Sequence, residues 1–348
     1  MLVALDSQEI IYSGRIDTTD AQKPEFIFPA SSMRVRFFGK SAHVLLKNKQ
    51  AYWKNSVGAI IDGEQKKWDI NDEGLTEVRL LEEEQDANHE ILLFKRQDSC
   101  HTFTIETFTL SKGARLLPID DIPNRRIEVY GDSISAGEVS EAVDYVGQPD
   151  PEHEGEYSNS WYSYAWMAAR KLNAQIHDIA QGGIGLLNGT GWVFPPVYPG
   201  MEFMWDKVHY HPQLGKVTDW DFSKYTPHIV IVAIGQNDNH PQDYMKESLY
   251  GEKAKHWKKK YQAFLCGLRS KYPTALIILT TTILEHDANW DTAIEEACQE
   301  MKDERIRHFL YSRNGRGTKG HIRIPEAEEM SDELVAYIEN LTLPIWEV

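Results

Sequence analysis

The feature of this sequence that most restricts its fold is a change in the spacing of its apolar residues near residue 118. From about residue 9 to residue 112 the chain consists of short apolar runs, several of which alternate with polar residues in a period of two. Such alternation is typical of strands with one buried face. The expected strands cover residues 9–14, 25–30, 32–39, 42–48, 57–63, 76–82, 89–96 and 102–110. About eight strands without a convincing helix predict a β-sandwich of the jelly-roll type.

From residue 119 onward, apolar strands alternate with helices. The expected strands cover residues 126–131, 174–180, 228–235, 275–281 and 306–311. The expected helices cover residues 158–172, 253–271 and 290–303, with a last helix after residue 324. Because the strands are continuously apolar, they predict a parallel sheet with helices on both faces, which is a three-layer α/β/α fold of the flavodoxin-like kind.

Two of the helices carry more detailed expectations. Ser158 or Ser160 is expected to cap the first helix. In the last helix, Ala327, Met330, Leu334 and Ile338 share one face, and Pro325 stands near the first turn. Between the two halves, the stretch "SKGARLLPIDDIPNRR" contains two prolines and neither periodicity. We therefore predict two domains, residues 1–118 and 119–348.

The charge of the chain restricts its partners. Lys and Arg number 37 against 53 Asp and Glu, which gives a formal net charge of −16. Nucleic acid and anionic membrane surfaces attract basic patches, so neither is expected as a partner. The sequence has no run of about 18 apolar residues, so we expect no membrane span. These observations favour a neutral substrate.

The cysteines and the start of the chain give further expectations. Cys100, Cys266 and Cys298 lie far apart without a CxxC motif, which argues against a zinc site and a disulfide framework. Acidic residues near the candidate site lack metal-ligand spacing, so neither a metal nor another cofactor is expected. The start "MLVALDSQEI" is too short and too acidic for a signal peptide. Two compartments stay open: the cytoplasm, or a secreted or periplasmic location if the chain is a processed form.

Three motifs lie where strands of the second half end. "VYGDSISAG" places Ser133 directly after a strand, where a serine at a strand-to-helix turn projects its hydroxyl outward. "IAQGGIGLL" places Gly183 after the next strand, and a glycine allows a backbone N–H to approach a ligand closely. "VIVAIGQND" places Asn237 after a third strand, where its amide could reach an oxyanion. Taken singly, each motif is more often a plain turn.

Together, the order and separation of these motifs resemble the SGNH (GDSL) hydrolase superfamily, whose name stands for Ser, Gly, Asn and His. The matching residues are Ser133, Gly183, Asn237 and a histidine. A β-sandwich ahead of such a domain, with the segments "IYSGRID", "WDFSKYTPHIVIVAIGQND" and "PPVYPG", is similar to carbohydrate esterase family 2 over nearly the whole chain. The resemblance implies removal of acetyl groups from plant polysaccharides such as xylan and glucomannan.

Three histidines are candidates for the catalytic base. His211 lies in a loop away from a strand end, and His240 follows Asp238 by two residues in "NDNHPQ". His321 lies between the last strand and the last helix. The SGNH base comes from the loop before the C-terminal helix, whereas His240 shares its loop with Asn237. The resemblance therefore favours His321.

The residues before His321 depart from the superfamily pattern. The acid that usually stands two or three positions earlier is replaced by Lys319 and Thr318. Some members of carbohydrate esterase family 2 use a Ser–His dyad whose histidine is held by main-chain oxygen. We therefore expect a dyad, with a backbone carbonyl at Nδ1 of His321. A distant carboxylate, Asp287 or Glu285, is the alternative.

The resemblance also implies a mechanism. His321 would act as general base for Ser133. The backbone N–H groups of Ser133 and Gly183 and the side chain of Asn237 would form the oxyanion hole.

Aromatic residues are the candidates for substrate contact. Trp192, Tyr198 and Trp205 follow the Gly183 motif in the segment "NGTGWVFPPVYPGMEFMW". They would either stack on a sugar ring or pin the loop down. Two other functions stay open, a general carboxylesterase or lipase and a carbohydrate-binding protein with an inert hydrolase domain.

Overall fold

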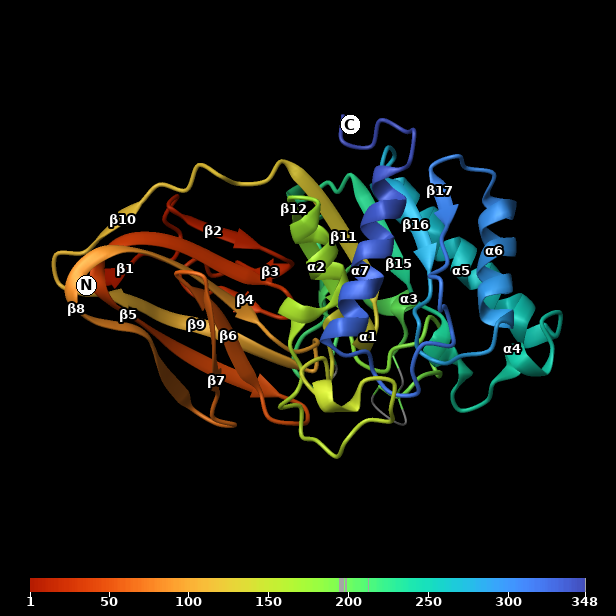
Figure 1. Cartoon of the computed structure of the whole chain (residues 1–348), viewed down its shortest axis with the longest axis horizontal. Helices are drawn as coiled ribbons and strands as arrows, with labels where there is room; N and C mark the ends of the chain where they lie inside the picture. The colour runs from red at the N-terminus through yellow and green to blue at the C-terminus, as the bar shows by residue number, and fades with distance from the viewer. Residues whose placement is uncertain (194–196, 198, 212, 348) are drawn as a thin grey trace.

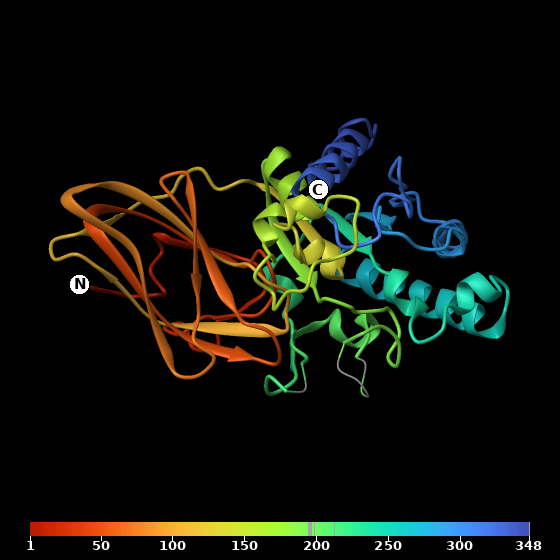
Figure 2. The same ribbon diagram turned by 60° about the horizontal axis from the view of Figure 1, so that its bottom comes forward.

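The first half of the chain forms one antiparallel sheet. The computed structural model describes residues 1–193, 197, 199–211 and 213–347. The strands of this sheet are β1 (Leu2–Val3), β2 (Ile10–Ser13), β3 (Ile16–Asp17), β4 (Glu25–Phe26), β5 (Ser32–Gln50), β6 (Ser56–Ile61), β7 (Glu64–Asp69), β8 (Leu75–Lys95), β9 (His101–Leu110) and β10 (Arg115–Leu117). Their order is β3-β4-β9-β5-β8-β6-β7, with β1 paired to β9 and with β2 and β10 paired to β5. The sheet curls over on itself around a buried apolar cluster, which gives the expected jelly-roll type of domain (Figure 2).

Two pairs of expected strands are each one long strand. Residues 32–39 and 42–48 both belong to β5, and residues 76–82 and 89–96 both belong to β8. The pairing of β5 with β8 shifts register between Gly39 and Ser41, where Gly39 faces Ala87 and Ser41 faces Glu82. A bulge therefore replaces the expected turns, because extra residues in one strand bend it without ending the pairing.

The second half forms the expected three layers (Figure 1). Its sheet has the order β12-β11-β15-β16-β17, and all neighbouring strands are parallel. The strands are β11 (Arg125–Gly131), β12 (Ala174–Ala180), β15 (Ile229–Ala233), β16 (Leu276–Thr280) and β17 (Ile306–His308). A separate pair consists of β13 (Lys207–His209) and β14 (Thr218–Asp219).

The helices cover both faces of this sheet. They are α1 (Ser133–Ala136), α2 (Tyr164–Lys171), α3 (Met201–Met204), α4 (Tyr244–Glu247), α5 (Glu252–Lys271), α6 (Asn289–Met301) and α7 (Ile324–Glu339), with the 3-10 helices η1 (Val143–Tyr145), η2 (Ser160–Tyr162), η3 (Phe222–Lys224) and η4 (Gln236–Asn239). One buried cluster joins α2 and α7 to strand residues such as Val129 and Ile231. Another joins α5 and α6 to Val230 and Ile277.

The expectation for the last helix is confirmed, whereas the expectation for the cap of the first helix is wrong. In α7, the predicted face is buried, and Pro325 lies in the first turn. The expected cap of the helix near residue 158 is wrong, because α2 begins at Tyr164 and the Ser163 hydroxyl accepts the N–H of Trp166. The hydroxyl of Ser160 is used elsewhere, since it donates to the carbonyl of Lys95 in the first half, 2.7 Å away.

The two halves share buried polar contacts. Arg15, which lies between β2 and β3, is fully buried and forms an ion pair with Glu128 of β11 at 3.3 Å. The same guanidinium donates to the hydroxyl of Tyr130 and to the carbonyl of Trp205, both at 2.6 Å. The first sheet ends at Leu117 and the second begins at Arg125, so the proposed domain boundary lies in the segment between them. In the part of the chain that the structure describes, no helix combines the length and the apolar character that a membrane crossing requires.

Candidate active site

A hollow of about 450 Å³ lies where the strands of the parallel sheet end and the first half of the chain meets the second. It is lined by Tyr52, Trp53, Ser133, Glu138, Asp150, Gly182, Gly183, Trp192, Asn237, Leu284, Lys319, Gly320 and His321. The four residues of the predicted catalytic set, Ser133, Gly183, Asn237 and His321, therefore share one pocket with Trp192. We refer to this hollow as the catalytic pocket.

Ser133 is presented by a sharp turn between β11 and α1. It is the first residue of α1, and Asp132 caps the helix by accepting the N–H of Ile134 at 3.0 Å. Gly131 precedes the turn, and a Cβ there would lie 2.1 Å from the hydroxyl oxygen of Ser135 and 2.3 Å from its Cβ, so the Ser135 side chain occupies the space that a side chain at residue 131 would need. Ser133 is 5% exposed and lines the catalytic pocket. This is the strand-turn-helix context in which a serine acts as a nucleophile.

The second carboxylate oxygen of Asp132 joins the serine turn to the Asn237 loop. Asp132 Oδ2 accepts hydrogen bonds from Gln236 Nε2 at 2.8 Å and from Asn237 Nδ2 at 3.0 Å. Burial raises the pKa of Asp132 to about 6. Because an amide nitrogen carries two hydrogens, one N–H of Asn237 is available to an oxygen in the pocket.

The partner of His321 differs from the expected one. His321 Nδ1 lies 2.5 Å from Asp150 Oδ2, and the His321 backbone N–H donates to Asp150 Oδ1 at 2.9 Å. The expected backbone carbonyl at Nδ1 is therefore wrong, and a carboxylate occupies its place. Asp150 precedes the histidine by 171 residues, so the spacing around residue 321 carries no sign of it. Asp287, one of the carboxylates considered, instead accepts the N–H of Asn289 at 3.0 Å.

Charges around His321 favour its protonated form. Burial lowers the pKa of His321, but the carboxylates of Glu138 and Asp150 outweigh it, so the pKa lies above the ordinary 6.5. Burial raises the pKa of Asp150, but the hydrogen bonds from His321 and Arg323 outweigh it and leave that pKa well below its ordinary range. Since Nδ1 is bound to Asp150, Nε2 is the ring nitrogen that can exchange a proton in the pocket.

Glu138 is a second carboxyl group of the pocket that the sequence motifs do not indicate. Its side chain is 7% exposed, and its Oε2 has no hydrogen-bond partner among the described residues. Burial raises the pKa of Glu138 to about 7. Its position, five residues after Ser133 and two residues after the end of α1, is the only sequence signal that could have indicated it.

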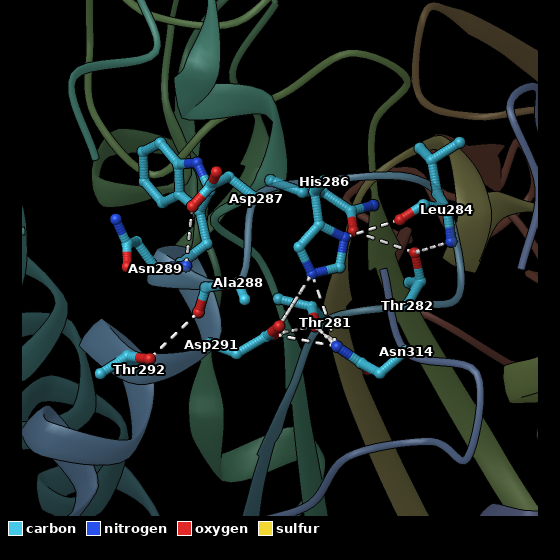
Figure 3. A network of polar contacts seen from close by, with 12 residues as sticks. Thr281, Thr282, Leu284, His286, Asp287, Ala288, Asn289, Asp291, Thr292 and Asn314 are labelled. Carbon is cyan, nitrogen blue, oxygen red and sulfur yellow. Dashed lines mark hydrogen bonds and ion pairs between the residues drawn. The ribbon is translucent and has the colours of Figure 1, made fainter. Parts of the chain in front are cut away.

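Figure 3 shows a polar network that joins the loop after β16 to the start of α6 and to Asn314. His286 Nδ1 donates to the carbonyl of Leu284 at 2.6 Å, and its Nε2 lies 3.2 Å from Asp291. Burial lowers the pKa of His286, but the hydrogen bond and charge of Asp291 outweigh it and raise the pKa. Thr282 in the same loop donates to Gln236 Oε1 at 2.9 Å. The network thus fixes Leu284 in the pocket wall and supports the residue that binds Asp132.

The remaining histidine candidates lie outside the described lining of the catalytic pocket. His240 stacks on Trp192 with a ring separation of 3.5 Å and lines a neighbouring hollow. His211 is buried, and its ring lies against Tyr210. The structure therefore brings only His321, of the three candidates, to the described wall of the pocket that holds Ser133.

The three aromatic candidates have different places. Trp192 is 59% exposed and lines the pocket. Tyr198 lies outside the described residues. Trp205 packs against Phe222 and Phe264, with ring separations of 5.6 and 5.9 Å, and is not among the described residues that line the pocket. Its position at the end of α3 turns it toward the apolar core, so the expected substrate contact is not supported.

Two groups of residues carry side chains of the kind that bind metal ions. They are Asp98, Cys100 and His101, and Asp17, Glu25 and His209. In the first group the Cys100 thiol is 2.7 Å from His101 Nδ1, and in the second His209 Nε2 is 2.9 Å from Asp17 Oδ2. Each group thus has internal hydrogen bonds, and none of its residues is among the described lining of the catalytic pocket.

Comparisons with known proteins relate the chain to carbohydrate esterases. A family model described as carbohydrate esterase 2 N-terminal matches residues 12–119. Cellulase/esterase CelE of Acetivibrio thermocellus is 28% identical over 347 residues, which is 96% of this chain and 40% of that protein. The chain thus spans less than half the length of this relative.

Two further comparisons cover nearly all of both proteins. An acetylxylan esterase / glucomannan deacetylase of Cellvibrio japonicus is 26% identical over 350 residues, which is 97% of this chain and 90% of that protein. A solved structure of a family two carbohydrate esterase from Clostridium thermocellum, in complex with cellohexaose, superimposes with a TM-score of 0.79 at 26% identity. That alignment covers 95% of this chain and 98% of the solved one.

Proposed function

We propose that the chain is an SGNH hydrolase of the carbohydrate esterase family 2 type and that it removes O-acetyl groups from carbohydrates. The observation that carries the proposal is that Ser133 and the Asp150–His321 pair line one pocket. A serine, a histidine and a carboxylate that binds Nδ1 of that histidine are the parts of a nucleophilic hydrolase.

The first half of the reaction forms an acetyl-enzyme. Nε2 of His321 accepts the proton of the Ser133 hydroxyl while Oγ attacks the acetyl carbonyl. Asp150 keeps the proton of the neutral imidazole on Nδ1 and stabilises the imidazolium that forms. The backbone N–H groups of Ser133 and Gly183 and the free N–H of Asn237 donate to the oxyanion.

The second half returns the enzyme to its starting state. The protonated His321 donates its proton to the sugar oxygen as the ester bond breaks, and the deacetylated sugar leaves. The same nitrogen then accepts a proton from water, whose oxygen attacks the acetyl group on Ser133. As this intermediate collapses, the bond between Oγ and the acetyl carbon breaks, His321 returns its proton to Oγ, and acetate leaves.

The substrate class that we propose is acetylated plant polysaccharide or oligosaccharide of the xylan or glucomannan type. Tyr52, Trp53 and Trp192 present aromatic surface on the pocket wall, which suits the apolar face of a sugar ring. Glu138 Oε2, which has no hydrogen-bond partner among the described residues, supplies an acceptor for a sugar hydroxyl group. An acetylxylan esterase / glucomannan deacetylase is among the relatives with which the chain aligns over 97% of its length.

The experiment that tests the proposal is an acetate-release assay on acetylated xylan and acetylated glucomannan. Wild-type protein should release acetate from one or both polymers, and His321→Ala should not. Release by His321→Ala at the wild-type rate would contradict the mechanism. Intact sugar binding without acetate release by the wild type would instead identify a binding protein with an inert hydrolase domain.

A general carboxylesterase or lipase is the second enzyme hypothesis. It predicts that p-nitrophenyl esters with long acyl chains are hydrolysed at least as fast as p-nitrophenyl acetate. The proposed esterase should prefer the acetate, and comparison of the two esters separates the hypotheses.

A further inference from the structure

A segment of the first domain, which runs from the last residue of β8, Lys95, to the first residue of β9, His101, reaches the loop that carries Gly183. Seven consecutive residues of this segment, all polar or cysteine, are buried. Asp98 Oδ2 accepts hydrogen bonds from the backbone N–H of Gly182 and from Gln181 Nε2, both at 2.7 Å. Its other oxygen, Oδ1, accepts the N–H of Cys100 at 3.1 Å. Asp98 is thus fixed in its own domain and bonded to the loop after β12.

Ser99 makes a second set of contacts with the same loop. Its hydroxyl lies 3.1 Å from the carbonyl of Ala180, 3.1 Å from Gln181 Oε1 and 2.7 Å from the hydroxyl of Tyr210. The loop after β12 is therefore bonded to the first domain directly before Gly182 and Gly183.

Asp98 can approach the backbone this closely because residue 182 is a glycine. A Cβ at residue 182 would lie 2.7 Å from Asp98 Oδ2 and 2.5 Å from Glu138 Oε2. Only glycine leaves room for both carboxyl groups beside the backbone. Two consecutive glycines have many accessible backbone conformations, so the direction of the Gly183 N–H depends on what holds the loop.

We propose that Asp98 is a positioning residue of the esterase, through which the first domain holds the Gly182–Gly183 loop in the conformation that binds the oxyanion. The inference rests on the proposed function, since it assigns a support to that same site. Asp98 does not belong to the described pocket lining, so it acts through Gly182 and not on the substrate.

A buried ammonium group lies close to Asp98. The ammonium of Lys95 donates to the carbonyls of Asp98 and Gln97. Burial lowers the pKa of Lys95 to about 8, so the ammonium form still prevails at neutral pH. A positive charge beside Asp98 offsets the effect that a lone carboxylate would have on an oxyanion nearby.

The test compares Asp98→Asn and Asp98→Ala with wild type in the full chain, using p-nitrophenyl acetate and an acetylated xylo-oligosaccharide. Loss of one oxyanion donor costs about 10²–10³ in kcat. The loss of kcat should be smaller when a donor is displaced than when it is removed. We therefore expect kcat to fall about 10-fold for Asp98→Asn and up to about 100-fold for Asp98→Ala. We expect KM to change by less than about threefold because Asp98 makes no substrate contact.

A boronic acid supplies a readout that a merely structural role would not change. Phenylboronic acid forms a tetrahedral anionic adduct on a serine hydroxyl and so requires the oxyanion hole. Its inhibition constant should rise in the Asp98 variants by the factor by which kcat/KM falls. Should Asp98→Ala fail to fold, Asp98→Asn carries the test, since its amide keeps an acceptor in one of the two positions.

Ser160→Ala is the matched control. Ser160 donates to the carbonyl of Lys95 at 2.7 Å, so its truncation removes another buried hydrogen bond between the same two domains. The control should lower Tm without changing kcat or the inhibition constant. If the Asp98 variants, like the control, changed neither kcat nor the inhibition constant, the inference would be overturned. A wild type that hydrolyses no acetate ester would overturn the proposed function itself, and with it the basis of the inference.

Discussion

Replacement of Asp150 by asparagine tests the acid that the structure assigns to His321. Asp150 Oδ1 accepts from the His321 backbone N–H and from Arg323 Nη2 at 2.8 Å, and an asparagine oxygen could keep both bonds. The amide nitrogen would then replace Oδ2, which lies 2.5 Å from His321 Nδ1. An amide N–H donates, so Nδ1 would become the acceptor and the imidazole proton would move to Nε2. His321 could then no longer take the proton of Ser133.

The expected loss follows from this change of tautomer. In the serine proteases, an Asp→Asn change at the corresponding position lowers kcat about 10⁴-fold with the geometry intact. We expect a loss of about 10³–10⁴ here, which corresponds to about 4–5.5 kcal/mol in activation free energy. Initial rates with p-nitrophenyl acetate would measure kcat, and thermal unfolding would show that the variant is folded.

Glu285→Gln is the control for this prediction. Glu285 is an exposed carboxylate of the loop after β16 and was the alternative distant acid in the sequence. Its replacement should leave kcat within about twofold of wild type, as is usual for a surface substitution. If Asp150→Asn retained kcat within about 10-fold of wild type, main-chain oxygen would suffice to orient His321, and the reasoning from the Asp150 contact would be refuted.

Three further predictions concern single residues of the pocket. Since the base must be neutral and the pKa of His321 is raised, the pH–kcat/KM profile of the wild type should fall on the acid side with a midpoint above pH 6.5. The Glu138→Gln variant lacks a carboxylate that favours the imidazolium, so the midpoint of its profile should be lower by up to about one pH unit. Ser133→Ala should lower kcat on the order of 10⁵–10⁶-fold, and full esterase activity in that variant would contradict the mechanism. Trp192→Ala should raise KM for an acetylated xylo-oligosaccharide by about 2–10-fold if its ring stacks on a sugar, and an unchanged KM would assign Trp192 to the support of its own loop.

The parallel sheet could be predicted from the sequence because its strands are apolar on both faces. All five residues of β15, Ile229–Ala233, are buried, as a strand between two helical layers requires. Parallel strands place their carboxyl ends on one edge, so the motifs of Ser133, Gly183 and Asn237 had to meet there. For the same topological reason, the loop before α7 brings His321 to that edge.

The features that could not be predicted depend on contacts between distant segments. Asp150 lies in an irregular loop without periodicity, and its path is fixed by tertiary bonds such as that from Arg323. Ser160 does not cap α2, because the first domain uses its hydroxyl. The spacing of residues along the chain indicates neither the position of Asp150 nor the contact that Ser160 makes with the first domain.

The position of Arg15 has a consequence for how the protein unfolds. Its guanidinium and the carboxylate of Glu128 are both fully buried, although Arg15 lies in the first half of the chain and Glu128 in the second. Removal of one partner from such a pair typically costs about 3–5 kcal/mol, since a charge is left without its counterpart. Unfolding of either half alone would leave the other half with one of these charges and without its counterpart. We therefore expect differential scanning calorimetry to show a single heat-absorption peak, with a calorimetric enthalpy equal to the van't Hoff enthalpy of the whole chain.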